Sequence, residues 1–207
     1  MRRRKGNKVK MTLILASKST SRRTLLKQAG LNFKTIAANI DENRIKNEML
    51  KLGSKVSEIS EKLASEKALK ISRDHLNDYV IGADQILTCD EKLFSKAKDI
   101  EEAREHLKFF RGKYHILTTS VSLAINENII WCYTSEPRLK MRHFSDEFLE
   151  EYLVKAGAAI TASVGCYFIE DLGIQLFSDV NGDYNDILGL PLLPLFQKLR
   201  ELNLLND

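Results

Sequence analysis

Residues 13–26 read LILASKSTSRRTLL and carry two structural signals side by side. The apolar run at residues 13–16 is typical of a short buried strand. After Arg22 apolar residues recur at helical spacing and Gly30 follows as a stop signal, so we expect a helix over residues 22–29. A strand that leads directly into a helix is the unit from which α/β folds are built. The stretch therefore predicts an α/β fold.

The junction between this strand and this helix carries hydroxyl and guanidinium groups. Ser17 and Ser19 can donate hydrogen bonds, and Arg22 and Arg23 can hold an anion through two parallel N–H groups. The first backbone N–H groups of a helix are also unpaired and attract negative charge. These groups indicate an anion site, and a capped helix with two solvated arginines is the alternative that the stretch leaves open.

The net charge of +4 comes from one end of the chain. Residues 1–10 hold six Lys/Arg and no acid, whereas the remaining residues hold 26 basic and 28 acidic side chains. We expect residues 1–10 to form a disordered basic tail, with contact to nucleic acid or anionic lipid as the alternative. Residues 11–207 are long enough for one large domain or two small lobes with a substantial core.

Several classes of protein are disfavoured by what the sequence lacks. No apolar run approaches the roughly 20 residues that span a bilayer. Cys89, Cys132 and Cys166 stand far apart without CxxC spacing, which indicates reduced thiols and a cytoplasmic protein. The four histidines form no pair at ligand spacing, so we expect no zinc site. The Walker lysine motif is absent, which disfavours a P-loop ATPase.

Residues 79–87, YVIGADQIL, contain the strongest single candidate for a functional side chain. Apolar residues stand at both parities, as in a central strand that is buried on both faces. Asp84 interrupts this run, and a buried carboxylate is costly unless it is paired or binds a metal. We therefore interpret Asp84 as functional, with a structural acid as the alternative. A turn at residues 90–91 predicts a hairpin that returns Lys96 to the level of Asp84.

Two further candidates are less distinctive by themselves. Residues 57–73 predict a long amphipathic helix capped by Ser57, in which Lys67 borders the apolar stripe like a snorkelling surface lysine. Residues 37–55 are polar and begin as a predicted loop, in which Glu42 follows Asp41 just after an apolar residue. A pair of acids in such a place is usually solvated, and a metal or water ligand is the alternative.

The rest of the chain continues the mixture of strands and helices. Further strands are predicted at residues 33–36, 115–125, 129–134, 138–144 and 174–180, and further helices at residues 101–110, 145–157 and 191–202.

With these stretches in place, the sequence resembles the Maf family of nucleoside triphosphate pyrophosphatases. The family motif Leu-Ala-Ser-x-Ser-Pro-Arg-Arg matches residues 15–22, where Thr20 replaces the proline and Ser21 the first arginine. Paired arginines one step later are similar to the branch linked to 7-methyl-GTP. Further matches, in the correct order, are Asp41-Glu42, Glu66-Lys67, Gly82-Ala83-Asp84-Gln85, Lys96, Gly112 with His115, and Gly189-Leu190-Pro191-Leu192.

The resemblance implies a fold and a reaction. The fold is α/β, with a long, mixed, twisted sheet flanked by helices and a central cleft between two lobes, as in inosine-triphosphatase-like proteins. The reaction is hydrolysis of a nucleoside triphosphate to the monophosphate and pyrophosphate with Mg²⁺ or Mn²⁺. A homodimer is implied, and neither a membrane nor nucleic acid is an expected partner.

The resemblance also implies roles for residues. Asp84 and Glu42 would hold the metal and act on the attacking water. Lys67 and Lys96 would join them as catalytic residues. The substrate would be bound by Ser17, Ser19, Arg22, Arg23, Gln85 and Glu170.

Glu170 stands where many family members have glutamine, within the sequence YFIED at residues 167–171. The 7-methyl-GTP branch likewise has glutamate there, and it has Asp-Gln at the position of Asp84-Gln85. These features predict a modified guanosine triphosphate rather than dTTP or UTP, with an ordinary loop acid as the alternative for Glu170. A non-enzymatic regulator of septum formation or a nucleic-acid-associated factor is the alternative function.

Overall fold

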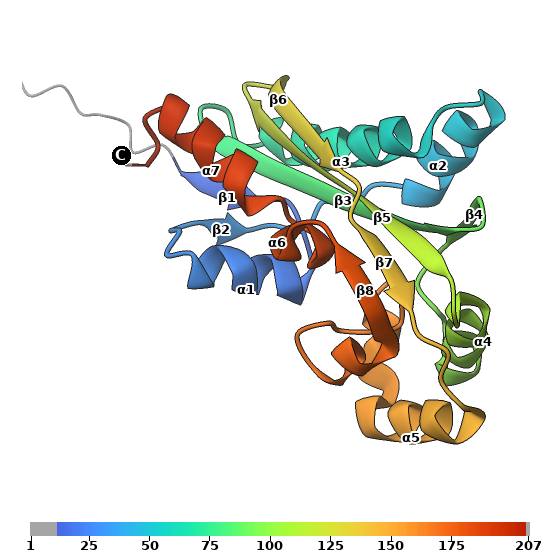
Figure 1. Cartoon of the computed structure of the whole chain (residues 1–207). Helices are drawn as coiled ribbons and strands as arrows, with labels where there is room; N and C mark the ends of the chain where they lie inside the picture. The colour runs from blue at the N-terminus through green and yellow to red at the C-terminus, as the bar shows by residue number, and fades with distance from the viewer. Residues whose placement is uncertain (1–11, 206–207) are drawn as a thin grey trace, which may run out of the picture.

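A computed structural model describes residues 12–205, and the basic tail expected over residues 1–10 lies outside the described residues. In this part of the chain, eight strands form one mixed sheet in the order β2-β1-β3-β5-β7-β8, with β4 beside β3 and β6 beside β5 (Figure 1). The strands are β1 (Leu13–Leu15), β2 (Lys34–Thr35), β3 (Tyr79–Cys89), β4 (Lys92–Phe94), β5 (Tyr114–Ile125), β6 (Asn128–Ser135), β7 (Arg138–Met141) and β8 (Phe177–Asn181).

Seven α-helices and two 3₁₀ helices accompany these strands in the described part of the chain. The α-helices are α1 (Thr20–Gln28), α2 (Glu42–Lys51), α3 (Val56–Ser72), α4 (Ile100–Phe110), α5 (Asp146–Ala156), α6 (Tyr184–Ile187) and α7 (Leu192–Glu201). The 3₁₀ helices are η1 (Gly157–Ala162) and η2 (Leu172–Leu176).

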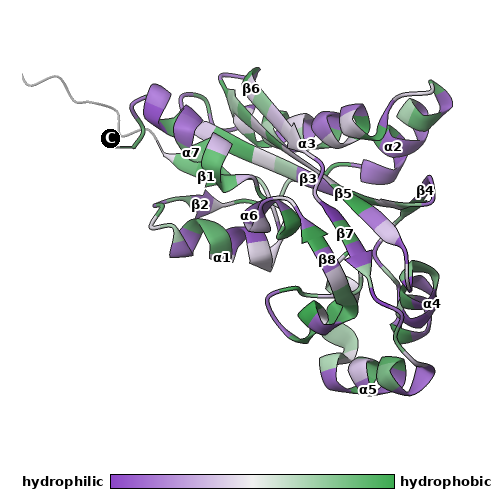
Figure 2. Ribbon diagram, in the orientation of Figure 1, coloured by the Kyte–Doolittle hydropathy of each residue, from purple (hydrophilic) through white to green (hydrophobic). Residues whose placement is uncertain are grey.

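The sheet is mixed because only its first strands are joined by helical crossovers. β1 pairs in parallel with β2 and β3. The other pairs are antiparallel: β5 pairs with β3, β6 and β7, and β7 pairs with β8. β3 and β5 are the longest strands and lie next to each other in the middle of the sheet, where they are apolar over much of their length (Figure 2). The expected long, mixed α/β sheet is confirmed.

Helices cover both faces of β3, and a glycine sets the distance on one of them. Ala68 of α3 packs with Val80, while Leu26 of α1 and Leu195 of α7 pack on the opposite face with Ile81. A Cβ atom at Gly82 would lie 2.0 Å from the backbone oxygen of Ala64. The α3 backbone therefore touches β3 directly, which no larger residue at this position would allow.

The apolar core is divided between two parts of the molecule. A large cluster joins α4, α5 and the loop after η1 to the ends of β5 and β7, around Phe110, Leu139, Tyr152 and Tyr167. Separate clusters lie around β1 and β3 with α1, α3 and α7. The interpretation of residues 11–207 as one two-lobed domain stays a prediction.

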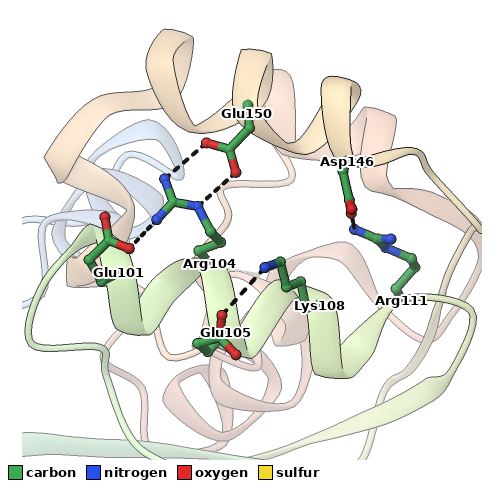
Figure 3. Close-up of polar contacts among 7 residues, drawn as sticks. All are labelled: Glu101, Arg104, Glu105, Lys108, Arg111, Asp146 and Glu150. Carbon is green, nitrogen blue, oxygen red and sulfur yellow. Dashed lines mark hydrogen bonds and ion pairs between the residues drawn. The ribbon is translucent and has the colours of Figure 1, made fainter.

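Ion pairs join the two helices α4 and α5 at the surface of the larger cluster (Figure 3). Arg104 donates from Nε and a terminal nitrogen to both carboxylate oxygens of Glu150, at 2.7 and 2.9 Å, and also contacts Glu101. Arg111 donates to Asp146 at 2.6 Å. Because these carboxylates are exposed, the pairs orient α5 more than they stabilise the fold.

Several expected elements differ from the observed ones. Residues 37–41 form the expected loop, but the helix that follows at residues 42–51 was not predicted; it forms because the Asp41 side chain accepts from the Arg44 backbone N–H and Ile45 is buried. The predicted cap Ser57 is wrong: α3 begins after Lys55, whose backbone N–H donates to Glu58.

The C-terminal region, from residue 172 onward, also differs from the expected elements. The predicted strand at residues 174–180 is shorter, because residues 172–176 form η2, where Gly173 packs against the Phe168 backbone. The short helix α6 was not predicted. No helix in the described residues is long and apolar enough to cross a membrane.

His115 makes the fold sensitive to acid. The ring is buried against Phe110, its Nε2 lies 2.8 Å from the Tyr167 hydroxyl, and burial lowers its pKa to about 4. Below the unfolded pKa, near 6.5, the unfolded chain binds a proton here that the folded chain does not. The free energy of unfolding therefore falls as the pH falls from about 6.5 to about 4.

We expect this one group to remove about 2 kcal/mol of stability between pH 7 and pH 5. Urea unfolding of wild type and His115→Gln at both pH values measures it, since the variant should lose less stability on acidification. His143→Gln, in which the replaced ring is exposed, is the control and should follow wild type. Parallel losses in wild type and His115→Gln would contradict the assignment.

Candidate active site

A cavity of about 580 Å³ lies between the β1–α1 junction, α2, α3, β3 and the loop after η1. It is lined by nine of the ten residues that the sequence pointed to: Ser17, Ser19, Arg22, Glu42, Lys67, Asp84, Gln85, Lys96 and Glu170. The tenth, Arg23, is exposed and is not among the lining residues. Residues from both halves of the chain therefore meet in one cavity.

The β1–α1 junction presents hydroxyl groups to this cavity. Ser19 caps α1, with its Oγ accepting from the Arg22 backbone N–H at 3.4 Å, and Ser17 Oγ accepts from the Ser19 N–H at 3.1 Å. Each hydroxyl accepts from the backbone, so its own O–H is left to donate to a ligand. Together with the positive end of α1, the junction favours an anion.

Arg22 has a structural task in addition to the predicted one. Its Nε donates to the Gly189 carbonyl at 2.7 Å and a terminal nitrogen donates to the Ala83 carbonyl at 2.8 Å. Burial lowers the pKa of this guanidinium, and the charges of Asp84 and Glu42 partly offset that effect. A guanidinium carries five N–H groups, so three remain for an anion in the cavity.

The centre of the cavity is a lysine between two carboxylates. Lys67 Nζ lies 2.7 Å from Asp84 Oδ1 and 3.0 Å from Glu42 Oε1. Lys67 is only 7% exposed, so the interpretation of a snorkelling surface lysine is wrong. Asp84 is equally buried, as expected for a carboxylate that interrupts a central strand, and its charge is balanced by Lys67.

Lys96 approaches the same group from the end of the β3–β4 hairpin. It lines the cavity together with Asp84, as the hairpin predicts. Burial is the main cause that lowers the pKa of its ammonium, and the positive charges of Arg22 and Lys67 lower it further. The charged form of such a lysine is stabilised most when a negatively charged ligand enters the cavity.

Gln85 lies on the face of β3 opposite to Asp84 and holds a neighbouring segment. Its amide nitrogen donates to Thr119 Oγ1 at 2.8 Å and lies 3.1 Å from the carbonyl oxygens of Asp186 and Ile187. With its nitrogen so engaged, Gln85 has its Oε1 left for a ligand. Gln85 therefore fastens α6 to the sheet.

The other end of the cavity is lined by the loop after η1. Phe168 and Ile169 stand there beside exposed Glu170. Tyr167 also lines the cavity, but it is buried and its hydroxyl is bonded to His115. An aromatic face for a ligand ring at this end thus comes from Phe168 rather than Tyr167.

Two lysines in the lining were missed from the sequence. Lys46 lies one turn after Glu42 on α2, and Lys18 lies between the two serines of the β1–α1 junction. Lys46 would have been found by extending a helix from the Asp41 cap, since residues four apart share a helix face. Lys18 carries no signal beyond its position in the junction.

The carboxylates can contribute to a divalent-metal site but cannot form it alone. The described residues hold no group of three or more His, Cys, Asp or Glu side chains that could bind a metal ion. Glu42 and Asp84 supply oxygen ligands on either side of a positive charge that Lys67 already provides. Mg²⁺ is commonly bound by one or two carboxylates together with waters and substrate phosphates. The donor set fits that mode.

Known proteins are similar to this chain over most of its length. Residues 12–202 match the family model described as Maf-like protein. A nucleoside triphosphate pyrophosphatase from Granulibacter bethesdensis is 47% identical over 92% of this chain and 97% of its own. A 7-methyl-GTP pyrophosphatase from Rhizobium meliloti is 40% identical over 94% of this chain and 98% of its own. Among solved structures, a HAM1 protein from Coxiella burnetii is 17% identical, with a TM-score of 0.40 over 63% of this chain and 73% of that chain.

The two neighbouring arginines should differ sharply when each is replaced by alanine. Arg22→Ala leaves the Ala83 and Gly189 carbonyls without their donor and removes a cation from the cavity, so we expect a loss of about 1–3 kcal/mol of stability and weak binding of inorganic tripolyphosphate. Arg23→Ala should stay within about 0.5 kcal/mol of wild type and bind normally. Urea unfolding and titration calorimetry measure both; equal defects would indicate a shared clamp instead.

Proposed function

The chain belongs to the Maf family, and we propose that it hydrolyses nucleoside triphosphates to the monophosphate and pyrophosphate. The observation that carries the proposal is the buried Asp84–Lys67–Glu42 group in a cavity whose other cations point to an anionic ligand. Relatives named for this activity match over more than nine tenths of the chain.

The cations of the cavity suit a triphosphate. A nucleoside triphosphate carries about four negative charges at neutral pH, so charge neutralisation and positioning supply most of the catalysis. The free N–H groups of Arg22 and the ammonium of Lys96 would bind phosphate oxygens, and the hydroxyls of Ser17 and Ser19 would donate to them. The same groups would stabilise the charge that develops on the departing pyrophosphate.

The carboxylates would act on the attacking water. Asp84 and Glu42 would also hold Mg²⁺ or Mn²⁺, which when bound supplies further charge neutralisation at the phosphates. Either carboxylate could accept a proton from a water directed at the α-phosphorus. Asp84 is fixed by a central strand, and Glu42 begins a helix with its side chain half exposed, so the two differ in mobility.

The loop after η1 would bind the base. Glu170 offers only acceptors, which suit the two N–H donors on one edge of guanine. Methylation at N7 makes the ring cationic, so the negative charge of Glu170 and the face of Phe168 would favour it further. We therefore propose a 7-methylguanosine nucleotide as the preferred substrate, in keeping with the name of the Rhizobium meliloti relative.

The buried ion pair argues against the two alternative functions. A non-enzymatic regulator of septum formation, or a factor bound to nucleic acid, would have no use for a buried carboxylate that is paired with a buried lysine. Homodimer formation and a cytoplasmic location remain part of the proposal. Pyrophosphate release from a panel of nucleotides with Mg²⁺ or Mn²⁺ distinguishes these functions. If no nucleotide in the panel is hydrolysed, the regulator is favoured.

Asp84→Asn should reduce turnover to less than about a tenth of the wild-type value, a loss above roughly 1.4 kcal/mol of transition-state stabilisation. Asparagine keeps the shape of the side chain and removes the charge that would hold a metal or accept a proton. Steady-state pyrophosphate release measures turnover, and urea unfolding checks that the variant is folded. Activity above that level in a folded variant would show that Asp84 has no catalytic role.

The base preference should depend on Glu170. Wild-type protein is expected to hydrolyse 7-methyl-GTP with a higher kcat/KM than dTTP or UTP, because uracil and thymine offer one N–H between two carbonyls that a carboxylate repels. Glu170→Gln should narrow or reverse that gap, and Asp171→Asn, one residue along, is the matched control. A wild-type preference for dTTP or UTP, or a ranking unchanged in Glu170→Gln, would count against this proposal.

A further inference from the structure

Lys67 occupies the position between the two carboxylates that the proposed function assigns to a metal. Its ammonium lies within 3.0 Å of an oxygen from each of them. An ammonium has three N–H donors, so the two carboxylates take two and leave one. A cation is thus already present where Glu42 and Asp84 face each other.

The contacts of Lys67 with Asp84 and with Glu42 differ in how easily they can be broken. Lys67 and Asp84 lie on α3 and β3, two elements whose backbones touch at Gly82, and their side chains are 9% and 7% exposed. The Glu42 side chain is 50% exposed and lies at the first residue of α2. Breaking a buried pair leaves an uncompensated charge, whereas an exposed carboxylate can be hydrated instead. The Glu42 contact is therefore the one that opens at low cost.

A divalent cation that approaches these carboxylates alone meets the positive charge of Lys67. Like charges a few ångströms apart in a partly buried site repel strongly. The repulsion is relieved when phosphate oxygens accept the N–H groups of the lysine and also bind the metal. We propose that Lys67 is a tethered counter-ion which suppresses metal binding in the empty site and makes firm binding of a divalent metal depend on a bound triphosphate.

This inference rests on the proposed function for the nature of the ligand, but it concerns an equilibrium that can be measured without turnover. It assigns Lys67 a positioning role in the empty protein: to keep two carboxylates side by side without a metal. In the liganded protein the same ammonium is free on its Glu42 side to bind a phosphate oxygen. In the empty protein, the Lys67 ammonium thus takes the place of a metal between the two carboxylates.

The test is direct titration of the nucleotide-free protein with Mn²⁺, followed by the electron paramagnetic resonance signal of the free ion. Lys67→Met removes the charge while keeping a side chain of similar length, so we expect it to bind Mn²⁺ at least tenfold more tightly than wild type. Lys67→Arg keeps the charge and should bind Mn²⁺ as weakly as wild type. Lys62→Met is the matched control, because Lys62 lies on the same helix but pairs with Glu66 at the surface, outside the cavity.

Two further measurements test where Mn²⁺ binds and how its binding depends on the nucleotide, and a replacement variant covers the case of misfolding. Adding Asp84→Asn to Lys67→Met should abolish the gained Mn²⁺ affinity. If Lys67→Met does not fold, Lys67→Gln takes its place. On wild type alone, calorimetry with the αβ-methylene analogue of GTP should show at least tenfold tighter binding of the Mn²⁺-loaded analogue than of the metal-free analogue in a chelator.

The inference is overturned if nucleotide-free wild type binds Mn²⁺ as tightly as Lys67→Met does. It is also overturned if the tight site persists in the double variant, or if the metal leaves the affinity of wild type for the analogue unchanged. Failure of the proposed function is a separate result. Absence of hydrolysis together with the expected Mn²⁺ contrast would refute the reaction and retain the role of Lys67.

Discussion

The contact between α3 and β3 at Gly82 is the constraint on which the site depends. A hydrogen atom in place of a side chain lets the backbone of Ala64 approach the strand to a distance that any Cβ would prevent. Asp84 lies two residues along the strand from Gly82, on the same face, and Lys67 lies about one turn along the helix from Ala64. Close packing of two backbones thus creates a buried ion pair whose partners cannot move apart.

A buried pair of this kind is a poor source of stability, because removing two charges from water costs about as much as their attraction returns. The pair is important because it positions two charged groups in the cavity. The carboxylate is paired with a lysine within a central strand, and the lysine is held where phosphates would arrive. Glu42 adds a second, exposed carboxylate, so the group combines two fixed charges with one that can move.

The remaining walls are held by side chains that serve structure and site together. Arg22 ties Ala83 of β3 to Gly189, and Gln85 ties α6 to both β3 and β5. Arg22 donates to two backbone carbonyls, and Gln85 donates to the Thr119 hydroxyl and to carbonyls of α6, all of them far away in the sequence. These bonds carry α6 and the loop before α7 to the edge of the cavity, although the sequence around residues 183–190 has only weak structural signals of its own.

Local pattern by itself determined the α/β class, the long strand at residues 79–87 and the helix that contains Lys67, and it singled out Asp84 as the strongest candidate, because hydrophobic periodicity and the cost of a buried charge act within one segment. The predicted hairpin pointed to Lys96, and the resemblance assigned roles to Glu42, Lys96 and Glu170. Only the tertiary structure decided that Lys67 is buried between two carboxylates, that Arg23 faces outward and that Arg22 and Gln85 bind carbonyls. The partners in these contacts stand up to 167 residues apart, and no local pattern records such a distance.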